Sequence, residues 1–160
     1  MSKPSSITIY ATNKKANFNY NINDKFEAGI VLTGNEVKSI RTGKCNLSES
    51  FVIIRDGHPY IENFHISLYS NAREKEYQPT RRRKLLLKQR EINKIMGFLQ
   101  KSGTSATSLK IYNSSRNFLK VEIALVTGKK LYDKRESIKN REWERNKTRI
   151  LKEQYLCLYL

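Results

Sequence analysis

A β-hairpin signature at residues 51–66 most constrains the fold of this 160-residue chain. Two runs rich in β-branched and aromatic residues, Phe51 to Arg55 and Tyr60 to Ile66, flank the dipeptide Asp56-Gly57. An Asp-Gly pair between such runs is typical of a tight hairpin turn, because Gly57 can take a positive φ without steric cost. The pattern therefore predicts two antiparallel strands.

A second hairpin is expected further along the chain. Leu109 and Ile111, and then Leu119 to Leu125, alternate with polar residues at a period of two, and residues 113–117 read as the turn between them. Another strand is expected before Gly34, where Ile30 to Thr33 is rich in β-branched and apolar residues.

Two helices complete the expected elements. Residues 35–43 can form a short helix that Asn35 caps and Gly43 ends. An amphipathic helix is expected over residues 84–103, because apolar residues recur there at helical spacing: Leu85, Ile92, Ile95, Met96 and Leu99. Short strands with two helices favour a mainly β fold, an antiparallel β-barrel with helices attached.

The chain carries a formal net charge of +16. Self-repulsion on that scale favours a polyanionic partner, with nucleic acid as the first candidate and an anionic membrane surface as the second. No apolar run approaches the ~20 residues that span a bilayer, and the start lacks a secretion signal, so a cytoplasmic protein is expected. Cys45 and Cys157 are far apart and have no metal-ligand spacing, so we expect no disulfide, metal or cofactor.

No constellation of catalytic residues is visible. The run that begins at Gly128 lacks the rest of a phosphate-binding P-loop, and the few carboxylates lie mostly among lysines and arginines. A protein without enzymatic activity is therefore expected.

Three basic segments favour RNA: residues 13–15, residues 81–84 and the C-terminal tail. For any one of them, a solvated face is the plainer interpretation. Five aromatic residues could stack on unpaired bases, although packing in the core or at a barrel rim explains most of them equally well. They are Phe18, Tyr20, Tyr69, Tyr77 and Tyr112.

Glu27 and Glu36 are carboxylates next to expected strand and helix starts in a basic protein. Either could accept hydrogen bonds from a base or ribose. Glu36 could instead be a helix-start carboxylate that the helix dipole favours. The residues themselves leave both readings open.

The tail after Leu131 has no sustained apolar stripe. Arg141, Arg145 and Arg149 stand four apart and would repel one another along one face of a helix. This spacing predicts a segment that is disordered when free and becomes helical on an anionic surface.

Several motifs occur together in a recognisable order: "ATNKKA", "FEAGIVLTGNEVKSIRTGK", "HISLY", "PTRRRKLLLKQREI" and "GKKLYDKRESIKNREW". Over residues 9–151 the chain resembles the SmpB family, the SsrA-binding proteins of bacteria. The resemblance implies an oligonucleotide-binding (OB)-like barrel with two to three flanking helices. It also implies an adaptor that binds the tRNA-like domain of transfer-messenger RNA and brings it to stalled ribosomes for trans-translation.

The resemblance also implies the division of the chain and its partners. Residues 1–6 would be a flexible leader, 7–130 the RNA-binding barrel and 131–160 the basic tail, which enters the decoding centre and empty mRNA channel of the small ribosomal subunit. Elongation factor Tu would be an indirect partner through alanyl-tmRNA, and no membrane would be involved. A structural ribosomal protein with a basic extension is the alternative that composition alone allows.

Site residues follow from matching positions in the family motifs. Asn13, Glu27 and Leu86 match positions linked to RNA binding, and Lys14, Lys15, Lys38 and Arg41 are nearby basic candidates. The segment expected at the decoding site contains Gly128, Lys129, Lys130, Tyr132, Asp133, Lys134 and Arg135, followed later in the tail by Ile150 and Leu151. Asn17 and Phe18 stand where the family usually has Arg-His.

Overall fold

The computed structural model describes residues 7–70, 72, 76–129, 135, 139, 142–143 and 145–150. The chain divides into two compact units, Met1–Gly128 and Lys129–Leu160. The described residues of the first unit form nine strands and three helices: β1 Ile9–Thr12, α1 Lys14–Asn19, β2 Tyr20–Ile30, α2 Gly34–Arg41, β3 Cys45–Asn46, β4 Phe51–Arg55, β5 His58–Glu62, β6 His65–Ile66, β7 Arg83–Leu86, α3 Gln89–Leu99, β8 Thr104–Asn113 and β9 Leu119–Gly128.

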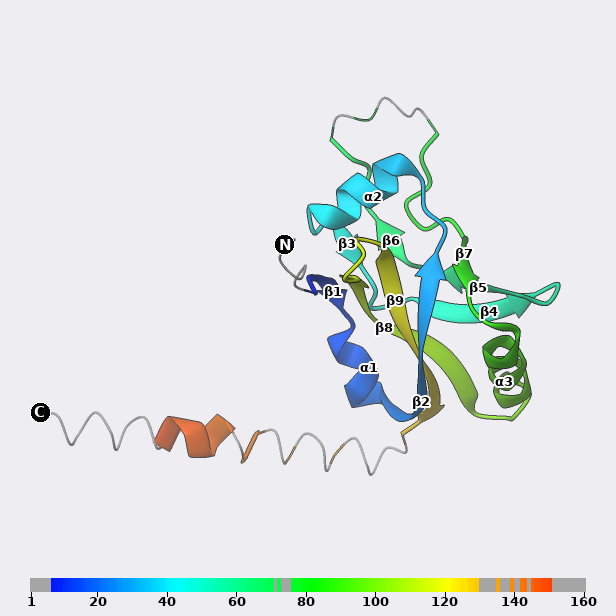
Figure 1. Cartoon of the computed structure of the whole chain (residues 1–160). Coiled ribbons are helices and arrows are strands. Elements are labelled where there is room, and N and C mark those ends of the chain that lie inside the picture. The colour runs from blue at the N-terminus through cyan, green and yellow to red at the C-terminus, as the bar shows by residue number, and fades with distance from the viewer. Residues whose placement is uncertain are drawn as a thin grey trace, which may run out of the picture. The chain divides into compact units, whose positions relative to one another are not determined.

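Six strands form a closed ring of hydrogen-bonded pairs (Figure 1). The order is β8-β4-β5-β7-β2-β9, and β9 pairs again with β8. Every pairing is antiparallel, and β1 adds to β8 outside the ring. The expected mainly β fold with attached helices is confirmed.

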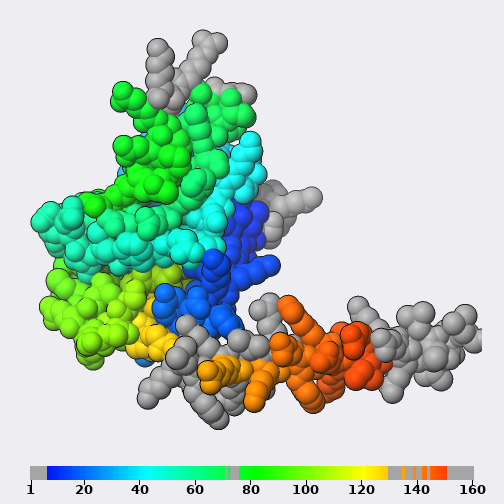
Figure 2. Space-filling view, turned by 180° about the vertical axis from the view of Figure 1, so that it is seen from behind, coloured from blue at the N-terminus to red at the C-terminus, as the bar shows by residue number. Residues whose placement is uncertain are grey.

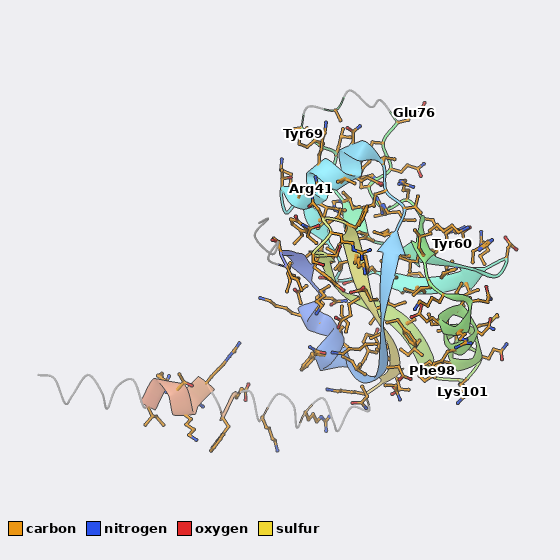
Figure 3. The ribbon with its side chains drawn as sticks, in the orientation of Figure 1. Arg41, Tyr60, Tyr69, Glu76, Phe98 and Lys101 are labelled. Carbon is orange, nitrogen blue, oxygen red and sulfur yellow. The ribbon has the colours of Figure 1, made fainter. Side chains whose placement is uncertain are left out.

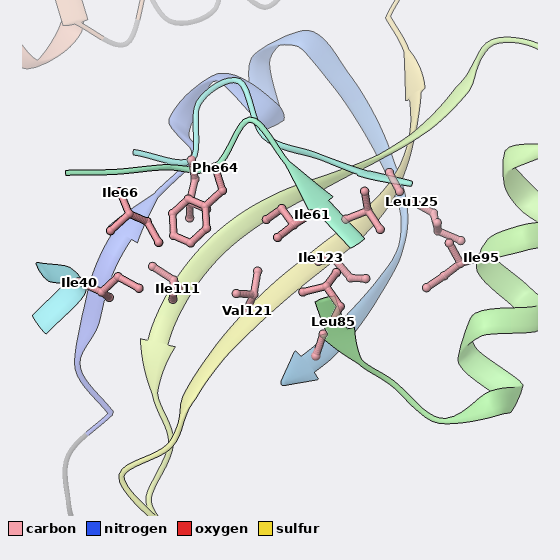
Figure 4. Packing of buried hydrophobic residues seen from close by; sticks show 14 residues of the cluster. Ile40, Ile61, Phe64, Ile66, Leu85, Ile95, Ile111, Val121, Ile123 and Leu125 are labelled. Atoms are coloured by element: carbon pink, nitrogen blue, oxygen red, sulfur yellow. The ribbon is translucent and has the colours of Figure 1, made fainter. Parts of the chain in front are cut away.

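The main core lies where the inner faces of these strands meet (Figure 4). Ile61, Phe64, Ile111, Ile123 and Leu125 are all fully buried there. Burial of each such side chain contributes about 1.5 to 3 kcal/mol, so this core accounts for much of the stability of the first unit.

Helix α1 covers a second, smaller cluster on the outer face of β8 and β9. Ala16 packs there with Leu109, Ala124 and Val126. Since β8 and β9 are covered on both faces, their buried residues form runs rather than a strict alternation. The residues of β1 and α1, blue in Figure 2, lie beside the cyan region that includes α2. Asn13 Nδ2 donates to the carbonyl oxygen of Leu47, which follows α2 in the chain.

Both predicted hairpins are confirmed. The β4–β5 turn has positive φ at Asp56 (50°) and Gly57 (71°), and the β8–β9 turn has positive φ at Asn117 (63°). The second strand of the first hairpin is shorter than expected. It ends at Glu62 because Asn63, at φ 52°, turns the chain, and the next two residues form β6, which pairs with β3.

The boundaries around α2 differ from the prediction. The strand expected in the segment that ends at Gly34 is present, but it begins and ends earlier, running from Tyr20 to Ile30. Thr33, not Asn35, caps the helix: its side chain accepts from the Glu36 backbone N–H, and Glu36 accepts from the Thr33 backbone in return. This reciprocal capping box satisfies two helix-start donors. Gly43 follows the end of the helix with φ 77°, as predicted.

The prediction that a helix begins at residue 84 is wrong for its first residues. Residues 83–86 form strand β7, and α3 begins only at Gln89. Arg83 and Leu85 point into the core, whereas Leu86 is exposed, which is the period of a strand. β7 is required between β5 and β2 to close the ring, and this pairing overrides the helical spacing of Leu85 with Ile92.

A buried ion pair joins α2 to β7. The Glu36 carboxylate and the Arg83 guanidinium are both fully buried, and Arg83 Nε donates to Glu36 Oε1 at 2.8 Å. Arg83 also donates to the carbonyl oxygens of Phe64 (2.6 Å), Arg81 (3.0 Å) and Pro79 (2.9 Å). Every side of the guanidinium therefore has a partner, as a buried charge requires.

Arg81 forms a second pair with the same carboxylate, its Nε donating at 2.8 Å. Burial alone would raise the pKa of Glu36, but hydrogen bonds from Arg81 and the Thr33 backbone, with the charge of Arg83, hold that pKa below its ordinary value. Glu36 is therefore an ionised structural carboxylate.

The basic segment at residues 81–84 has two kinds of side chain. Arg83 and Arg81 pair with Glu36, and Arg83 is fully buried, so these two guanidinium groups hold the fold together. Arg82 is more exposed and its Nε donates to Glu62 at 2.6 Å, while Lys84 lines a surface pocket. RNA binding by Arg82 and Lys84 stays a prediction.

We predict that Glu36→Gln lowers the free energy of unfolding by about 3 kcal/mol or more, because it leaves the buried Arg83 charge without its counter-ion. The matched control is Glu62→Gln, which removes the partner of the more exposed Arg82 and should cost less than about 1 kcal/mol. Urea unfolding of the two variants measures the difference. Equal losses in the free energy of unfolding would show that the buried Glu36–Arg83 pair stabilises the fold no more than the exposed pair does.

Candidate nucleic-acid interface

Glu27 lies on β2, where three neighbouring strands meet. Its carboxylate accepts hydrogen bonds from Tyr112 Oη on β8 and from Lys120 Nζ on β9. The side chain is nevertheless 48% exposed. A carboxylate has about four lone-pair sites, so Glu27 is held in place and can still accept from a ligand.

The surroundings keep Glu27 ionised. Hydrogen bonds from Lys120 and Tyr112 lower the pKa of Glu27. Burial and the hydrogen bond to Glu27 raise the pKa of Tyr112, so its phenol remains a donor. The structure thus distinguishes the roles of the two glutamates, which the sequence left open. Glu36 is structural, and Glu27 presents a fixed, accessible negative charge.

Leu86 lies at the end of β7 and is 56% exposed. It pairs with Gly29 of β2, and a Cβ added to Gly29 would come within 3.2 Å of Leu86 Cβ. The absence of a side chain at Gly29 lets Leu86 lie close against β2. An exposed leucine held by the ring in this way offers an apolar contact to a partner.

Two surface pockets adjoin Leu86, Gly29 and Lys120. The first, of about 540 Å³, is mostly apolar and is lined by Gly29, Ile30, Leu32, Val37, Arg41, Leu86, Asn117, Phe118, Leu119 and Lys120. The second, of about 630 Å³, is more polar and is lined by Glu27, Gly29, His58, Pro59, Lys84, Leu85, Leu86, Leu87, Lys88, Glu91, Ile92 and Lys120. The structure therefore brings the predicted residues Glu27, Arg41 and Leu86 together around one surface region.

Arg41 lies at the end of α2 (Figure 3), and its Nη2 donates to the carbonyl oxygen of Asn117 at 3.5 Å. Lys38, one turn earlier, places its Nζ 5.7 Å from the centre of the Tyr69 ring. Both side chains are exposed. Only Arg41 of the two lines the pocket beside Leu86.

Asn13 is buried at the start of α1, so its side chain is not exposed for direct contact with RNA. Its side chain is 3% exposed, and its Oδ1 accepts from the Ala16 backbone at the start of α1. Its Nδ2 donates to the carbonyl oxygens of Leu47 (3.2 Å) and Ser108 (3.1 Å). Asn13 therefore positions α1, including Lys14 and Lys15.

Lys14 and Lys15 are exposed at the start of α1. Lys15 Nζ lies 3.1 Å from Glu49 in an exposed ion pair, which a stronger anion can replace at little cost. Lys15 lines a third pocket, away from Leu86, together with Asn13. The predicted RNA-binding residues thus fall into more than one group.

Most of the five aromatic candidates take structural roles. Tyr112 is 8% exposed and bonds Glu27, Tyr77 Oη donates to the Ile66 carbonyl oxygen, and Tyr20 packs under α1. The exposed aromatic residue next to the predicted site is Phe118, at 67%. Sequence reasoning missed it because Phe118 directly precedes an alternating strand and resembles a core residue.

The predicted tail residues are only partly within the described chain. Gly128 ends β9 opposite Tyr20, and Lys129 begins the second unit. Arg135 and residues 145–150 are helical, and Ile150 is 51% exposed. Lys130, Tyr132, Asp133, Lys134 and Leu151 lie outside the described residues, as does the proposed leader at residues 1–6.

Two further features concern the described part of the chain. No cluster of three or more His, Cys, Asp or Glu residues there could hold a metal ion. Likewise, none of the helices in the described ranges is long and apolar enough to cross a membrane.

We predict that Asn13→Ala lowers the free energy of unfolding by about 2 kcal/mol, because it removes a helix cap and the buried hydrogen bonds that Nδ2 donates to the carbonyl oxygens of Leu47 and Ser108. The control is Asn93→Ala on the exposed face of α3, which bonds only Gln89 and should cost less than about 0.5 kcal/mol. Denaturant unfolding measures both. A variant Asn13→Ala that is as stable as Asn93→Ala would contradict the positioning role.

The chain is similar to known proteins of one family. The chain matches the family described as "SmpB protein" over residues 10–153. It is 46% identical over 144 residues to the SsrA-binding protein of Wolbachia pipientis (strain wPip), which covers 90% of this chain and 97% of the relative. It is 48% identical over 145 residues to the SsrA-binding protein of Sinorhizobium fredii, covering 91% of each chain.

A solved structure described as "tmRNA-SmpB: a journey to the center of the bacterial ribosome" contains a similar chain. The TM-score is 0.65 at 38% identity, and the match covers 78% of this chain and 86% of the other. The motifs, the fold and these relatives lead to one conclusion: the chain belongs to the SmpB family.

Proposed function

We propose that this protein binds the tRNA-like domain of transfer-messenger RNA (SsrA) and delivers it to stalled ribosomes for trans-translation. Its relatives are named for binding SsrA, and its structural neighbour is named for tmRNA and the ribosome. The observation that carries the proposal is the meeting of Glu27 and Leu86 at one surface region edged by Arg41 and Lys120.

The chemistry of this region suits folded RNA. Arg41 and Lys120 can neutralise phosphates, and Glu27 can accept from base or ribose donors that no lysine can satisfy. Leu86 offers apolar contact to an unstacked base. In this proposal the ring of strands is an OB-like barrel, and the protein acts by binding rather than by catalysis.

The second unit has a separate role in this proposal. The segment from Gly128 to Arg135, with Ile150 and Leu151 further along, occupies the decoding centre and the empty mRNA channel. The tail, expected to be disordered in the free protein, is helical at residues 145–150. In this proposal it completes its helix against ribosomal RNA, which relieves the repulsion among its arginines. The protein works in the cytoplasm and meets elongation factor Tu indirectly, through alanyl-tmRNA.

The test is a binding measurement with transfer-messenger RNA at physiological salt. The proposal expects the protein to bind this RNA at least about tenfold more tightly than an unrelated tRNA of similar charge. Equal affinity for both would contradict it, because sequence-independent attraction to phosphate would then explain all binding. Equal amounts of the protein on active and stalled ribosomes would favour a structural ribosomal protein instead.

We predict that the double variant Lys134→Glu with Arg135→Glu lowers peptide tagging on stalled ribosomes about tenfold or more, because two cations that face ribosomal RNA become anions. Affinity for transfer-messenger RNA should stay near that of the unaltered protein. Tagging in a reconstituted translation system and RNA binding are measured separately.

The control for this prediction reverses the same number of charges in the first unit. Arg55 and Lys101 are exposed and line neither pocket beside Leu86. The variant Arg55→Glu with Lys101→Glu should retain most of the tagging. Parallel loss of RNA binding and tagging in the tail variant would mean that the tail holds the RNA partner.

A further inference from the structure

Phe118 is an exposed aromatic residue that directly precedes strand β9. It is 67% exposed, whereas Leu119, the next residue, packs against the main core. Leu86, 56% exposed, lines the same pocket, so the two side chains together form an exposed apolar surface. Such a surface is suited to contact with a partner.

The turn that presents Phe118 is rigid. Ser114 N donates to the Phe118 carbonyl oxygen at 2.8 Å, and Phe118 N donates to Ser114 Oγ at 3.3 Å. Asn113 Nδ2 donates to Asn117 Oδ1 at 2.9 Å, and Arg41 reaches the Asn117 carbonyl oxygen from α2. With its neighbours held in this way, Phe118 is pre-organised for a ligand, which reduces the entropy cost of binding.

Phe118 and Leu86 line the same pocket of about 540 Å³. This volume lies within the range of about 300 to 1,000 Å³ that small ring-containing ligands occupy. The remaining wall is apolar, formed by residues such as Ile30, Leu32 and Val37. A flat ring that enters the pocket would contact Phe118 and Leu86 together.

Two cationic residues line this pocket, Arg41 and Lys120. Lys120 Nζ also bonds the Glu27 carboxylate, which lies in the neighbouring pocket, so Lys120 has both this carboxylate and a nucleotide phosphate within reach. An apolar hollow with cationic groups at its edge complements a nucleotide, whose base is flat and whose phosphate is anionic. An apolar peptide segment would match the hollow but would gain nothing from the two cations.

We propose that Phe118 stacks on one unpaired base of the RNA partner, which inserts into the pocket between Phe118 and Leu86 while Arg41 and Lys120 hold its phosphates. This inference rests on the proposed function, because the base belongs to transfer-messenger RNA. It assigns Phe118 as a stacking residue and makes the pocket a subsite for a single nucleotide.

Affinity for transfer-messenger RNA tests the stacking. Phe118→Ala should lower affinity about 10- to 100-fold, the usual loss when a stacked aromatic residue is removed. Phe118→Leu retains apolar bulk without a ring, so it should also bind clearly more weakly than the unaltered protein. The control Met96→Ala removes an exposed apolar side chain of α3, 38% exposed and in neither pocket, and should bind normally.

Salt dependence separates stacking from charge. Phe118→Ala should leave the slope of log affinity against log salt unchanged, since no phosphate contact is lost, whereas Lys120→Gln should make the slope shallower by about one unit. Because Phe118 is exposed, Phe118→Ala should also unfold at the same urea concentration as the unaltered protein. A changed salt slope in Phe118→Ala would overturn the stacking role.

Nucleotide-resolution 2′-hydroxyl acylation of the RNA gives an independent readout. At saturating protein, one or two unpaired nucleotides should be protected by the unaltered protein and by Met96→Ala but become reactive again with Phe118→Ala. Normal affinity of Phe118→Ala, normal affinity of Phe118→Leu, or unchanged protection would each overturn the inference. If only the stacking role is wrong, the unaltered protein still binds transfer-messenger RNA more tightly than an unrelated tRNA. If the proposed function is wrong, the unaltered protein binds both RNAs equally.

Discussion

The guanidinium of Arg83 is fully buried, and the carboxylate of Glu36 is its counter-ion. A buried charge without a partner costs several kcal/mol, so the start of α2 and strand β7 must come together in the folded state. β7 is the strand that joins β5 to β2 in the ring. The ion pair therefore helps determine which strands are neighbours as well as where the helix begins.

The candidate RNA surface depends on the same contact. Leu86 ends the strand that Arg83 begins, and Arg41 ends the helix that Glu36 helps to cap. Fixing the starts of these two elements also fixes their ends, which line one pocket with Phe118. The proposed binding groups are thus carried on elements that a buried interaction holds, an arrangement that would keep the proposed RNA site ordered before RNA binds.

Local patterns predicted the parts of the fold that local physics controls. The Asp56-Gly57 turn, the alternation at Leu119 to Leu125 and the stop at Gly43 depend on neighbouring residues only, and all three are confirmed. β7 escaped prediction because Leu85 fits a helical period as well as a strand, and only pairing with β2 and β5 decides between them. For the site, family motifs indicated Glu27 and Leu86, but not that Asn13 is buried or that Phe118 is exposed.

By itself, the sequence determined the hairpins and favoured a polyanionic partner, because turn chemistry and net charge do not depend on how distant segments meet. The tertiary structure alone decided the roles of chemically similar residues. Glu36 and Glu27 are both glutamates among cations, yet one is sealed against Arg83 and the other remains half exposed beside Lys120. The physical reason is that burial and pairing partners come from segments far apart in the chain, and these set whether a charge holds the fold together or faces a ligand.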